Sequence, residues 1–188
     1  KACIPIRISP DAFEPSKSQR RVFERNRDLG VTITTKADEF VTDEKVTLFR
    51  IYDKRHNPDS EKSFDEAKKT LIDMNGICRT AEDGKYESFY SGTINMDYRC
   101  SGKLVGVGII DTGKASLSSN YFYYDTSDET KKRSIGTYSI LREIELCRTF
   151  HLQRYYLGYW LKDCKSMVYK SNFKPHELLI DGVWKLIT

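Results

Sequence analysis

The sequence predicts an α+β fold, on three observations. Its composition, with 39% hydrophobic and 31% charged residues, is that of an ordinary globular protein. Apolar residues recur with helical spacing over the first third, and from Tyr86 the spacing changes to the alternation of strands. The 188 residues are enough to bury a core in one large domain or two small ones. We expect a helical N-terminal portion over 1–80 and a sheet-rich core over 81–188.

The first third is predicted to hold one strand and three helices. Residues 3–8 alternate as in an edge strand, and Pro5, which has no N–H, would limit its pairing. Ser16 or Ser18 is expected to cap a helix over about 17–29, because a hydroxyl oxygen accepts hydrogen bonds from the first turn. Two further helices are expected at about 38–55 and 63–75.

The remainder is predicted to hold strands around one long helix. A turn at Thr112-Gly113-Lys114 joins two of the strands, and a charged loop over 126–133 precedes the helix. The expected strands are 86–90, 102–111, 117–125, 153–160 and 177–184, and the expected helices are 134–150 and 165–172. This order resembles that of GNAT-type acyltransferases, whose mixed, mostly antiparallel sheet is flanked by helices.

The apolar runs and the cysteines argue against several classes of protein. The longest apolar run, Leu104 to Ile110, is far shorter than the roughly 20 residues of a membrane helix. Nothing resembles a signal peptide, so a cytoplasmic location without a membrane partner is expected. Five cysteines without CxxC spacing argue against a disulfide framework and against a self-contained zinc site. The net charge of +4 does not indicate a nucleic-acid partner by itself, because the distribution of charge matters more than its sum.

The start of the long helix is the first candidate binding site. A helix N-terminus offers free N–H groups and a positive dipole end, which suit an anion. Acetyltransferases that use coenzyme A hold its pyrophosphate there with several glycines, whereas this chain keeps only one, so we expect no coenzyme A and a donor other than acetyl-CoA. In the alternative interpretation, that one glycine, Gly136, permits close helix–strand packing. The residues expected to contact substrate are Ser134, Gly136, Thr137 and Tyr138.

The helix over 17–29 is the second candidate, because it is unusually basic. Lys17, Arg21 and Arg25 share one face of it at spacings of four residues, beside Arg20 and Arg27. Such a row is either a solvated face or a contact for a polyanion, which binds in a salt-dependent way. Arg20 or Arg21 is also a candidate partner for a substrate carboxylate, through two parallel hydrogen bonds.

Lysines after an aromatic strand form the third candidate site. Tyr159 lies in that strand, and Lys170 and Lys174 follow on a short helix, where an ammonium group stabilises the oxyanion of an acyl transfer. Aminolysis of an activated ester also needs a proton acceptor, for which Asp111 and Asp125, at strand ends, are candidates; capping is their alternative role. No GxSxG, HExxH or EF-hand pattern occurs, which disfavours hydrolase and metal chemistry.

Taken in order, these segments resemble the aspartate/glutamate leucyltransferases of bacteria, relatives of the eukaryotic arginyl-tRNA–protein transferases. Residues 40–103 contribute nothing to the resemblance. The segments that carry it are Ala2–Arg7, Phe13–Arg21, Leu117–Asp125, Ser134–Glu145, Tyr156–Trp160, Lys165–Pro175 and Gly182–Trp184.

The resemblance implies a GNAT-like fold and a function in the N-degron pathway. Leucine would pass from leucyl-tRNA to proteins that begin with Asp or Glu. The Tyr169-Lys170 pair is also similar to the lysine segment of Fem-type transferases, which use aminoacyl-tRNA, and this implies a catalytic role for both residues. Asp111, from its place at a strand end, remains the candidate acceptor of the proton. Arg20 or Arg21 would pair with the acidic acceptor residue, and the other substrate contacts would come from Asp125, Tyr159 and Lys174.

One departure from the family concerns cysteine. Its members carry an N-terminal CxxC-type cluster that binds an iron–sulfur centre or a metal, and only Cys3 of that cluster is present here. The chain also starts without methionine and within a predicted strand, so we expect it to be a piece of a longer protein and to bind no such cofactor.

Three other functions stay open at this point. Arginine is the alternative donor, because donor choice depends on details of the pocket. A non-catalytic RNA-binding module would use the basic helix alone. An acetyltransferase dependent on acetyl-CoA is the third and least expected.

Overall fold

The computed structural model describes residues 3–79, 86–88 and 92–188, with only the backbone described for the parts of 77–91 that it includes. The strands are β1 (Ile4–Ile8), β2 (Leu29–Thr34), β3 (Ile77–Arg79), β4 (Tyr86–Ser88), β5 (Thr93–Cys100), β6 (Lys103–Gly113), β7 (Ser116–Tyr124), β8 (Arg154–Trp160), β9 (His176–Ile180) and β10 (Val183–Ile187). The helices are α1 (Lys17–Arg25), η1 (Ala37–Glu39), α2 (Asp43–His56), α3 (Phe64–Met74), α4 (Asp128–Arg133), α5 (Ile135–Thr149), α6 (Lys165–Val168) and η2 (Tyr169–Asn172).

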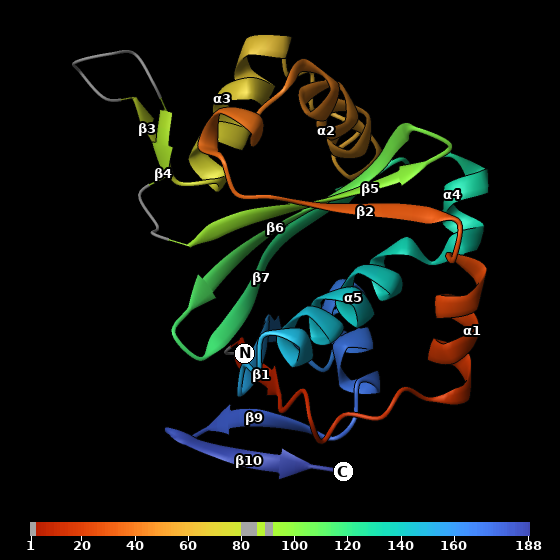
Figure 1. Ribbon diagram of the computed structural model, residues 1–188, viewed down its shortest axis with the longest axis vertical. Helices are drawn as coiled ribbons and strands as arrows, with labels where there is room; N and C mark the ends of the chain where they lie inside the picture. Colours follow the sequence, from red (N-terminus) through yellow and green to blue (C-terminus); the bar gives the residue numbers. More distant parts are fainter. Residues whose placement is uncertain (1–2, 80–85, 89–91) are drawn as a thin grey trace.

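The fold is a sheet of eight strands covered by helices on both faces, as Figure 1 shows. The strand order is β10-β9-β1-β8-β7-β6-β5-β2, and every pair is antiparallel except β7–β8, which is parallel. One core cluster lies between the sheet and helices α1 and α5, and a smaller one lies under α2 and α3. The predicted α+β fold with a mixed, mostly antiparallel sheet is therefore confirmed. Among the described residues, no helix is both long and apolar enough to cross a membrane.

Strand β1 lies inside the sheet, so the prediction of an edge strand is wrong. It pairs with β8 along its whole length but with β9 only through Ile6 and Arg7. Pro5 is tolerated in this interior strand because it has no partner in β9: that pairing begins at the next residue, Ile6. The expected division at residue 80/81 lies outside the described residues, and β1 and β2 belong to the same sheet as the strands that follow.

Helix α1 is shorter than predicted. Ser16 caps it, with Gln19 completing a capping box, but it ends at Arg25 rather than near residue 29. The Asn26 amide stops it by donating to the Val22 and Arg133 carbonyl oxygens, at 2.8 and 2.9 Å. Strand β2 then begins at Leu29 and forms the far edge of the sheet.

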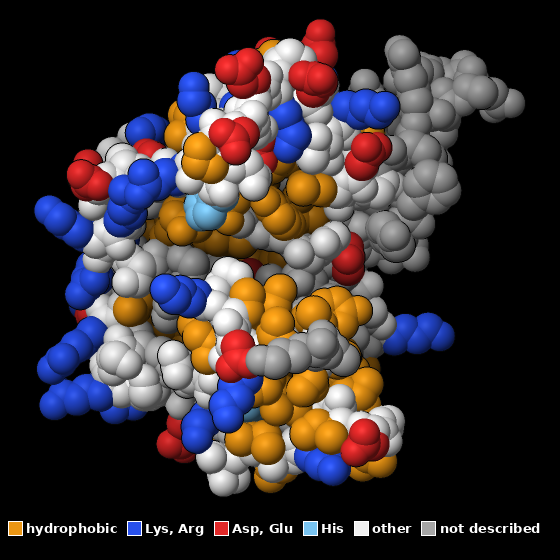
Figure 2. All heavy atoms as spheres, turned by 180° about the vertical axis from the view of Figure 1, so that it is seen from behind, with side chains coloured by type: hydrophobic (Ala, Val, Ile, Leu, Met, Phe, Trp, Pro, Cys, Tyr) orange, Lys and Arg blue, Asp and Glu red, His pale blue; other side chains and the backbone are white. Residues whose placement is uncertain are grey.

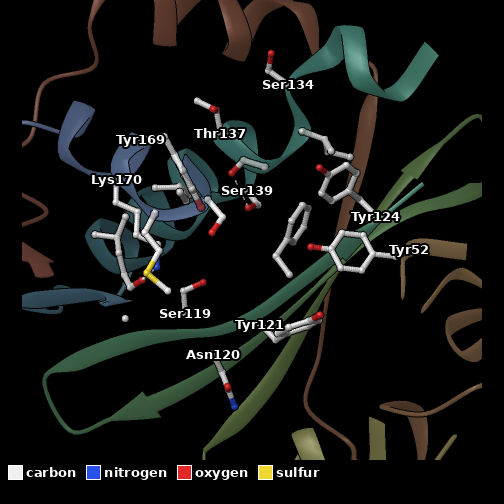
Figure 3. A pocket seen from close by; sticks show the side chains of 18 of the residues that line it. Tyr52, Ser119, Asn120, Tyr121, Tyr124, Ser134, Thr137, Ser139, Tyr169 and Lys170 are labelled. Atoms are coloured by element: carbon white, nitrogen blue, oxygen red, sulfur yellow. Dashed lines mark hydrogen bonds between the residues drawn. The ribbon is translucent and has the colours of Figure 1, made fainter. Parts of the chain in front are cut away.

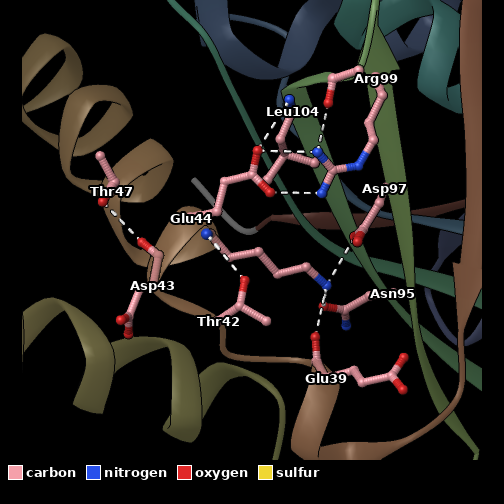
Figure 4. Close-up of polar contacts among 11 residues, drawn as sticks. Glu39, Thr42, Asp43, Glu44, Thr47, Asn95, Asp97, Arg99 and Leu104 are labelled. Carbon is pink, nitrogen blue, oxygen red and sulfur yellow. Dashed lines mark hydrogen bonds and ion pairs between the residues drawn. The ribbon is translucent and has the colours of Figure 1, made fainter.

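Helix α2 is anchored to the sheet by a buried polar network, drawn in Figure 4. The Lys45 ammonium lies 2.9 Å from the Asp97 carboxylate and donates to Asn95 Oδ1 at 3.2 Å and to the Glu39 carbonyl oxygen at 3.0 Å. At the start of the same helix, Glu44 accepts two hydrogen bonds from the Arg99 guanidinium, at 3.0 and 2.6 Å. Because Asn95, Asp97 and Arg99 all belong to β5, the helix is held to that strand, which was not among the predicted strands.

Apart from the missed strand β5, the second half follows the prediction closely, with three differences. The loop predicted over 126–133 contains a short helix, α4, capped by Ser127. The strand predicted over 177–184 is two strands, β9 and β10, because Asp181 and Gly182 adopt φ angles of 53° and 76° and close a tight hairpin. Of the strand predicted over 86–90, residues 86–88 form β4, and 89–90 lie outside the described residues.

Candidate active site

The main pocket lies where strands β7 and β8 part. These parallel strands pair at only three positions, the last joining Ser118 and Tyr156. Beyond that pair the strands diverge, and residues 119–122, 124 and 157–159 line a pocket of about 610 Å³, here called the wedge pocket. Helix α2 on one face of the sheet and helix α5 on the other complete its walls, together with α6 and η2 (Figure 3). A break in strand pairing thus opens a site inside the sheet.

The N-terminus of α5 faces the wedge pocket without a side-chain cap. Ser134, at φ 54°, makes no side-chain capping hydrogen bond, so the Ile135 and Gly136 N–H groups remain available, while the Thr137 N–H donates to the Ser134 carbonyl oxygen at 3.0 Å. A Cβ atom built on Gly136 would meet nothing within 4 Å, which contradicts the alternative that this glycine serves close packing. Ser134, Gly136 and Thr137 all line the pocket, so the structure brings three of the predicted contacts together at a positive helix end.

Lys170 lies on the opposite side of the wedge pocket, and its ammonium donates to the Leu157 and Tyr159 carbonyl oxygens of β8, at 2.6 and 3.0 Å. These carbonyls lie beyond the last β7–β8 pair, so the lysine satisfies acceptors that the parting of the strands leaves open. An ammonium group has three N–H donors, and one remains for a ligand. Burial lowers the pKa of Lys170.

Gly158 gives β8 its irregular shape beside that lysine. Its φ is +83°, and the β1–β8 register shifts at this point, so Gly158 pairs with Ile6 while Tyr156 pairs with the next residue, Arg7. A Cβ atom here would meet only the Lys170 ammonium, at an ordinary 3.6 Å. The glycine is therefore explained by its backbone conformation, which other residues rarely adopt.

Of the three predicted tyrosines, two line the wedge pocket. Tyr159 and Tyr169 do so, and both are exposed, at 56% and 39%. Tyr138 does not: it is 2% exposed and packs edge-on against Phe23 and Tyr98, with ring centroids 5.5 and 6.0 Å away. Tyr138 therefore belongs to the core between α1, α5 and the sheet, and the prediction that it contacts substrate is not supported by its position.

An aromatic wall was missed in the sequence. Tyr52 and His56, one turn apart on α2, stack with ring centroids 4.1 Å apart, and Tyr52 packs edge-on against Tyr121 and Tyr124 at 6.2 and 5.2 Å. All four line the wedge pocket. Tyr52 and His56 fall in residues 40–103, which carry no motif, and the i, i+4 spacing of two rings was the only signal.

A second pocket of about 570 Å³, here called the side pocket, adjoins the first. Tyr169 and Thr137 line both pockets, so they form the wall between them. Lys174 lines the side pocket and donates to the Thr188 carbonyl oxygen at 2.8 Å. The structure thus places one predicted cation, Lys174, beside the residues that separate the two pockets.

The two predicted carboxylates line neither pocket. Asp111 accepts a hydrogen bond from the Thr93 hydroxyl at 3.1 Å, and burial raises its pKa. Asp125 lies 2.9 Å from the Lys103 ammonium and accepts from the Ser127 N–H at 3.0 Å; although burial opposes its charge, these contacts hold its pKa below the usual value. Both carboxylates have structural partners where they lie, so their predicted roles gain no support from the geometry.

The predicted arginines lie outside both pockets. Arg20 and Arg21 are exposed, because α1 turns Gln19, Val22 and Phe23 toward α5 and the pockets. The Arg20 guanidinium donates to the Pro15 carbonyl oxygen, a neutral partner.

These arginines belong instead to a basic edge. Arg25 of α1 donates to the Lys132 carbonyl oxygen, which joins α1 to α4. Figure 2 shows Lys and Arg side chains along the left edge, where these helices lie, next to an apolar hollow. We call the exposed set the basic edge: Lys17, Arg20, Arg21, Arg25, Lys131 and Lys132. Lys131 also lines the wedge pocket, so the edge reaches the pocket.

No metal site is formed by the described part of the chain. Cys3 is exposed, and no three His, Cys, Asp or Glu side chains gather there as ligands would. These residues therefore do not fit an iron–sulfur centre, and the cofactor expectation stays a prediction.

Comparisons with known proteins agree on the family. Residues 44–180 match the family described as arginine-tRNA-protein transferase, C terminus. Proteins named aspartate/glutamate leucyltransferase from Saccharophagus degradans and Methylobacillus flagellatus are 34% and 35% identical to this chain; they align with 98% and 99% of it, over 71% and 68% of their own lengths.

Solved structures agree on the fold. The C-terminal domain of a putative lysylphosphatidylglycerol synthetase from Agrobacterium fabrum matches 84% of this chain, over 46% of its own, with a TM-score of 0.56 at 12% identity. A GCN5-related glucosamine N-acetyltransferase region of a fungal enzyme matches 94%, over 19% of its own chain, with a TM-score of 0.52 at 10% identity. These likenesses show a GNAT-like acyltransferase fold. The family match covers residues 44–180, and the relatives align with nearly the whole chain; this chain therefore belongs to the arginine-tRNA-protein transferase family.

Proposed function

We propose that this chain transfers leucine from leucyl-tRNA to the α-amino group of proteins that begin with Asp or Glu. Family membership makes it an aminoacyltransferase, and its relatives are named for this donor and these acceptors. The observation that carries the proposal is the wedge pocket, where an uncapped helix N-terminus faces a lysine with one free N–H. Because aminoacyl-tRNA is made in the cytoplasm, the proposal places the reaction there.

The wedge pocket suits the aminoacylated 3′ end of a tRNA. Its aromatic wall of Tyr52, His56, Tyr121 and Tyr124 offers faces on which unpaired bases stack. The N-terminus of α5 offers N–H groups and a positive dipole end to a phosphate. The basic edge then lies where the acceptor stem would leave the pocket, and it supplies salt-dependent affinity. The tRNA would therefore be bound and positioned through stacking on its bases and electrostatic contacts with its phosphates.

The side pocket suits the acceptor. Lys174 is the cation among the residues that line it and would pair with the acidic first residue, a role for which Arg20 and Arg21, outside the lining, are less well placed. Tyr169 and Thr137 stand between the two pockets, so an amine in one would face an ester in the other. Lys170 would stabilise the oxyanion that forms when the amine attacks the ester carbonyl.

Transfer of labelled amino acid tests the proposal. Purified protein is incubated with leucyl-tRNA or arginyl-tRNA and with peptides that begin with Asp, Glu or Ala. We expect leucine on the Asp and Glu peptides only. Transfer of arginine alone would replace the donor, an alternative favoured by the description of the family itself. No transfer from either tRNA would refute the proposal.

A lysine variant separates catalysis from binding. Lys170→Met should lower kcat about 100-fold or more while tRNA binding is mostly retained, because the lost N–H acts on the transition state. Lys165→Met, on exposed α6, is the matched control and should change neither. If Lys170→Met were fully active, the catalytic role of Lys170 would be refuted. An unaltered protein that binds tRNA but transfers neither amino acid would instead be a non-catalytic RNA-binding module. Coenzyme A should not raise the melting temperature; a rise would favour an acetyltransferase.

A further inference from the structure

Glu143 of α5 is a buried acid for which the reaction described so far has no use. It is 0% exposed, and its Oε2 accepts a hydrogen bond from the Tyr155 hydroxyl at 2.8 Å. Its Oε1 makes no hydrogen bond in the described part of the structure. A Cβ atom built on Gly108 of β6 would have that oxygen as its nearest neighbour, 3.6 Å away. A fully buried carboxyl oxygen without a partner is rare in native proteins and calls for an explanation.

Within the described part of the chain, no positive charge is among the groups that act on the Glu143 carboxyl. The titratable groups that act on or feel this carboxyl from the neighbouring elements are Tyr98 of β5, Cys147 of its own helix, Tyr155 of β8 and Tyr169 of η2. All are neutral near pH 7. Burial raises the pKa of Glu143 to about 7, against the opposing hydrogen bond from Tyr155. The group therefore exchanges a proton near neutral pH, unlike a permanently charged or permanently neutral acid.

Two hydroxyl groups connect Glu143 to the wedge pocket. Tyr155 and Ser119 both line that pocket, and the Ser119 hydroxyl acts on both members of the Glu143–Tyr155 pair, lowering the pKa of each against the effect of burial. Ser119 is the first residue of β7 beyond the last β7–β8 pair, and Figure 3 shows its side chain at the pocket. The buried carboxyl is thus separated from the pocket by hydroxyls, which both donate and accept protons.

The transfer reaction requires a proton acceptor at this place. The acceptor peptide arrives as an ammonium ion; as the C–N bond forms and the C–O ester bond breaks, nitrogen loses two protons. One goes to the departing 3′ oxygen of the tRNA, and the other needs a base. Asp111 and Asp125 do not line either pocket, so neither reaches the amine directly.

We propose that Glu143 is a positioning residue that receives this second proton through the Ser119 hydroxyl. Ser119 takes the proton from the amine and passes its own to the Glu143 carboxylate, which Tyr155 holds in place. The proton returns to solvent after the product leaves. This inference rests on the transferase function proposed above and adds the route of the proton.

Glu143→Gln tests the route, because the amide keeps the size of the side chain and an oxygen that accepts from Tyr155. In the unaltered protein, kcat should rise with pH through about 7, as the carboxyl loses its proton. In Glu143→Gln, kcat should fall about 100-fold or more, that rise should vanish, and KM for tRNA should stay unchanged. Glu145→Gln, on the same helix but outside the pocket lining, is the control and should keep the pH profile.

A second variant keeps the test decisive if Glu143→Gln does not fold. In Tyr155→Phe the carboxyl loses a hydrogen bond that favours its charged form, so the rise in kcat should move to higher pH. An active protein whose pH profile is unchanged in either folded variant would overturn the role of Glu143 and leave the transferase function standing. An unaltered protein that transfers nothing would overturn both.

Discussion

The buried pair of Lys45 and Asp97 makes a strong prediction about stability. Replacing Lys45 with Met keeps the length of the side chain but leaves the Asp97 carboxylate inside the protein without a cation. The two side chains are only 3% and 11% exposed, so solvent cannot replace the lost ammonium. Breaking a buried pair in this way lowers the free energy of unfolding by about 3–5 kcal/mol. For a domain of this size that corresponds to a fall in Tm of roughly 6–20 °C.

The matched control is Lys103→Met. Lys103 also lies 2.9 Å from an aspartate, Asp125, but its side chain is 72% exposed. Solvent screens this pair, so its loss should lower the free energy of unfolding by less than about 1 kcal/mol. Urea unfolding followed by circular dichroism measures both values. Equal losses in the two variants would refute the reasoning, since the two ion-pair distances match, whereas Lys45 is buried and donates two further hydrogen bonds.

The effect of Lys45→Met should also depend on pH. Burial already raises the pKa of Asp97 in the folded protein, and removal of the cation that opposes this effect raises it further. Between the unfolded pKa of about 3.9 and the raised folded value, the folded state binds more protons than the unfolded state. Lowering the pH through this window should therefore restore part of the lost stability. A loss that does not shrink on acidification would contradict the assignment to Asp97.

Three further predictions concern the pocket and the basic edge. Gly136→Ala should leave transfer and stability nearly unchanged because its Cβ meets nothing, whereas Gly136→Glu should fold normally but raise the KM for tRNA at least tenfold by repelling phosphate. Gly158→Ala should lower the free energy of unfolding by about 1–2 kcal/mol because of its positive φ, while Gly30→Ala, with no neighbour nearer than 3.9 Å, should change it much less in urea unfolding. Lys17→Gln with Arg21→Gln should weaken tRNA binding and reduce the slope of log K against log salt by roughly 1.5; an unchanged slope would remove these residues from the interface.

The parts of the fold that could be predicted were those with a strong local pattern. The apolar spacing of α5 and the alternation of β6, β7 and β8 are visible in the sequence, and so is the hairpin between β6 and β7. Strand β2 was missed because Leu29 continues the pattern of the preceding helix, and only the Asn26 side chain shows that the helix has ended. Whether β1 lies inside the sheet or at its edge depends on β9, which lies about 170 residues away.

The site was also predicted only where its features are local in the sequence. Ser134, Gly136 and Thr137 could be found because a helix start is a local feature. Tyr52 and His56 could not, because their place at the pocket depends on how α2 packs over the sheet. The sequence places Glu143 inside a helix, but its role depends on burial and on Tyr155, which comes from another strand.

The uncapped start of α5 has a consequence for how this protein balances stability against binding. A side-chain cap at such a position contributes about 0.5–2 kcal/mol, and Ser134 withholds it by adopting a left-handed backbone conformation. The free protein therefore gives up part of its stability to keep the helix end vacant. A phosphate that binds there acts as the missing cap, so each substrate-loaded molecule should resist unfolding and proteolysis better than an empty one.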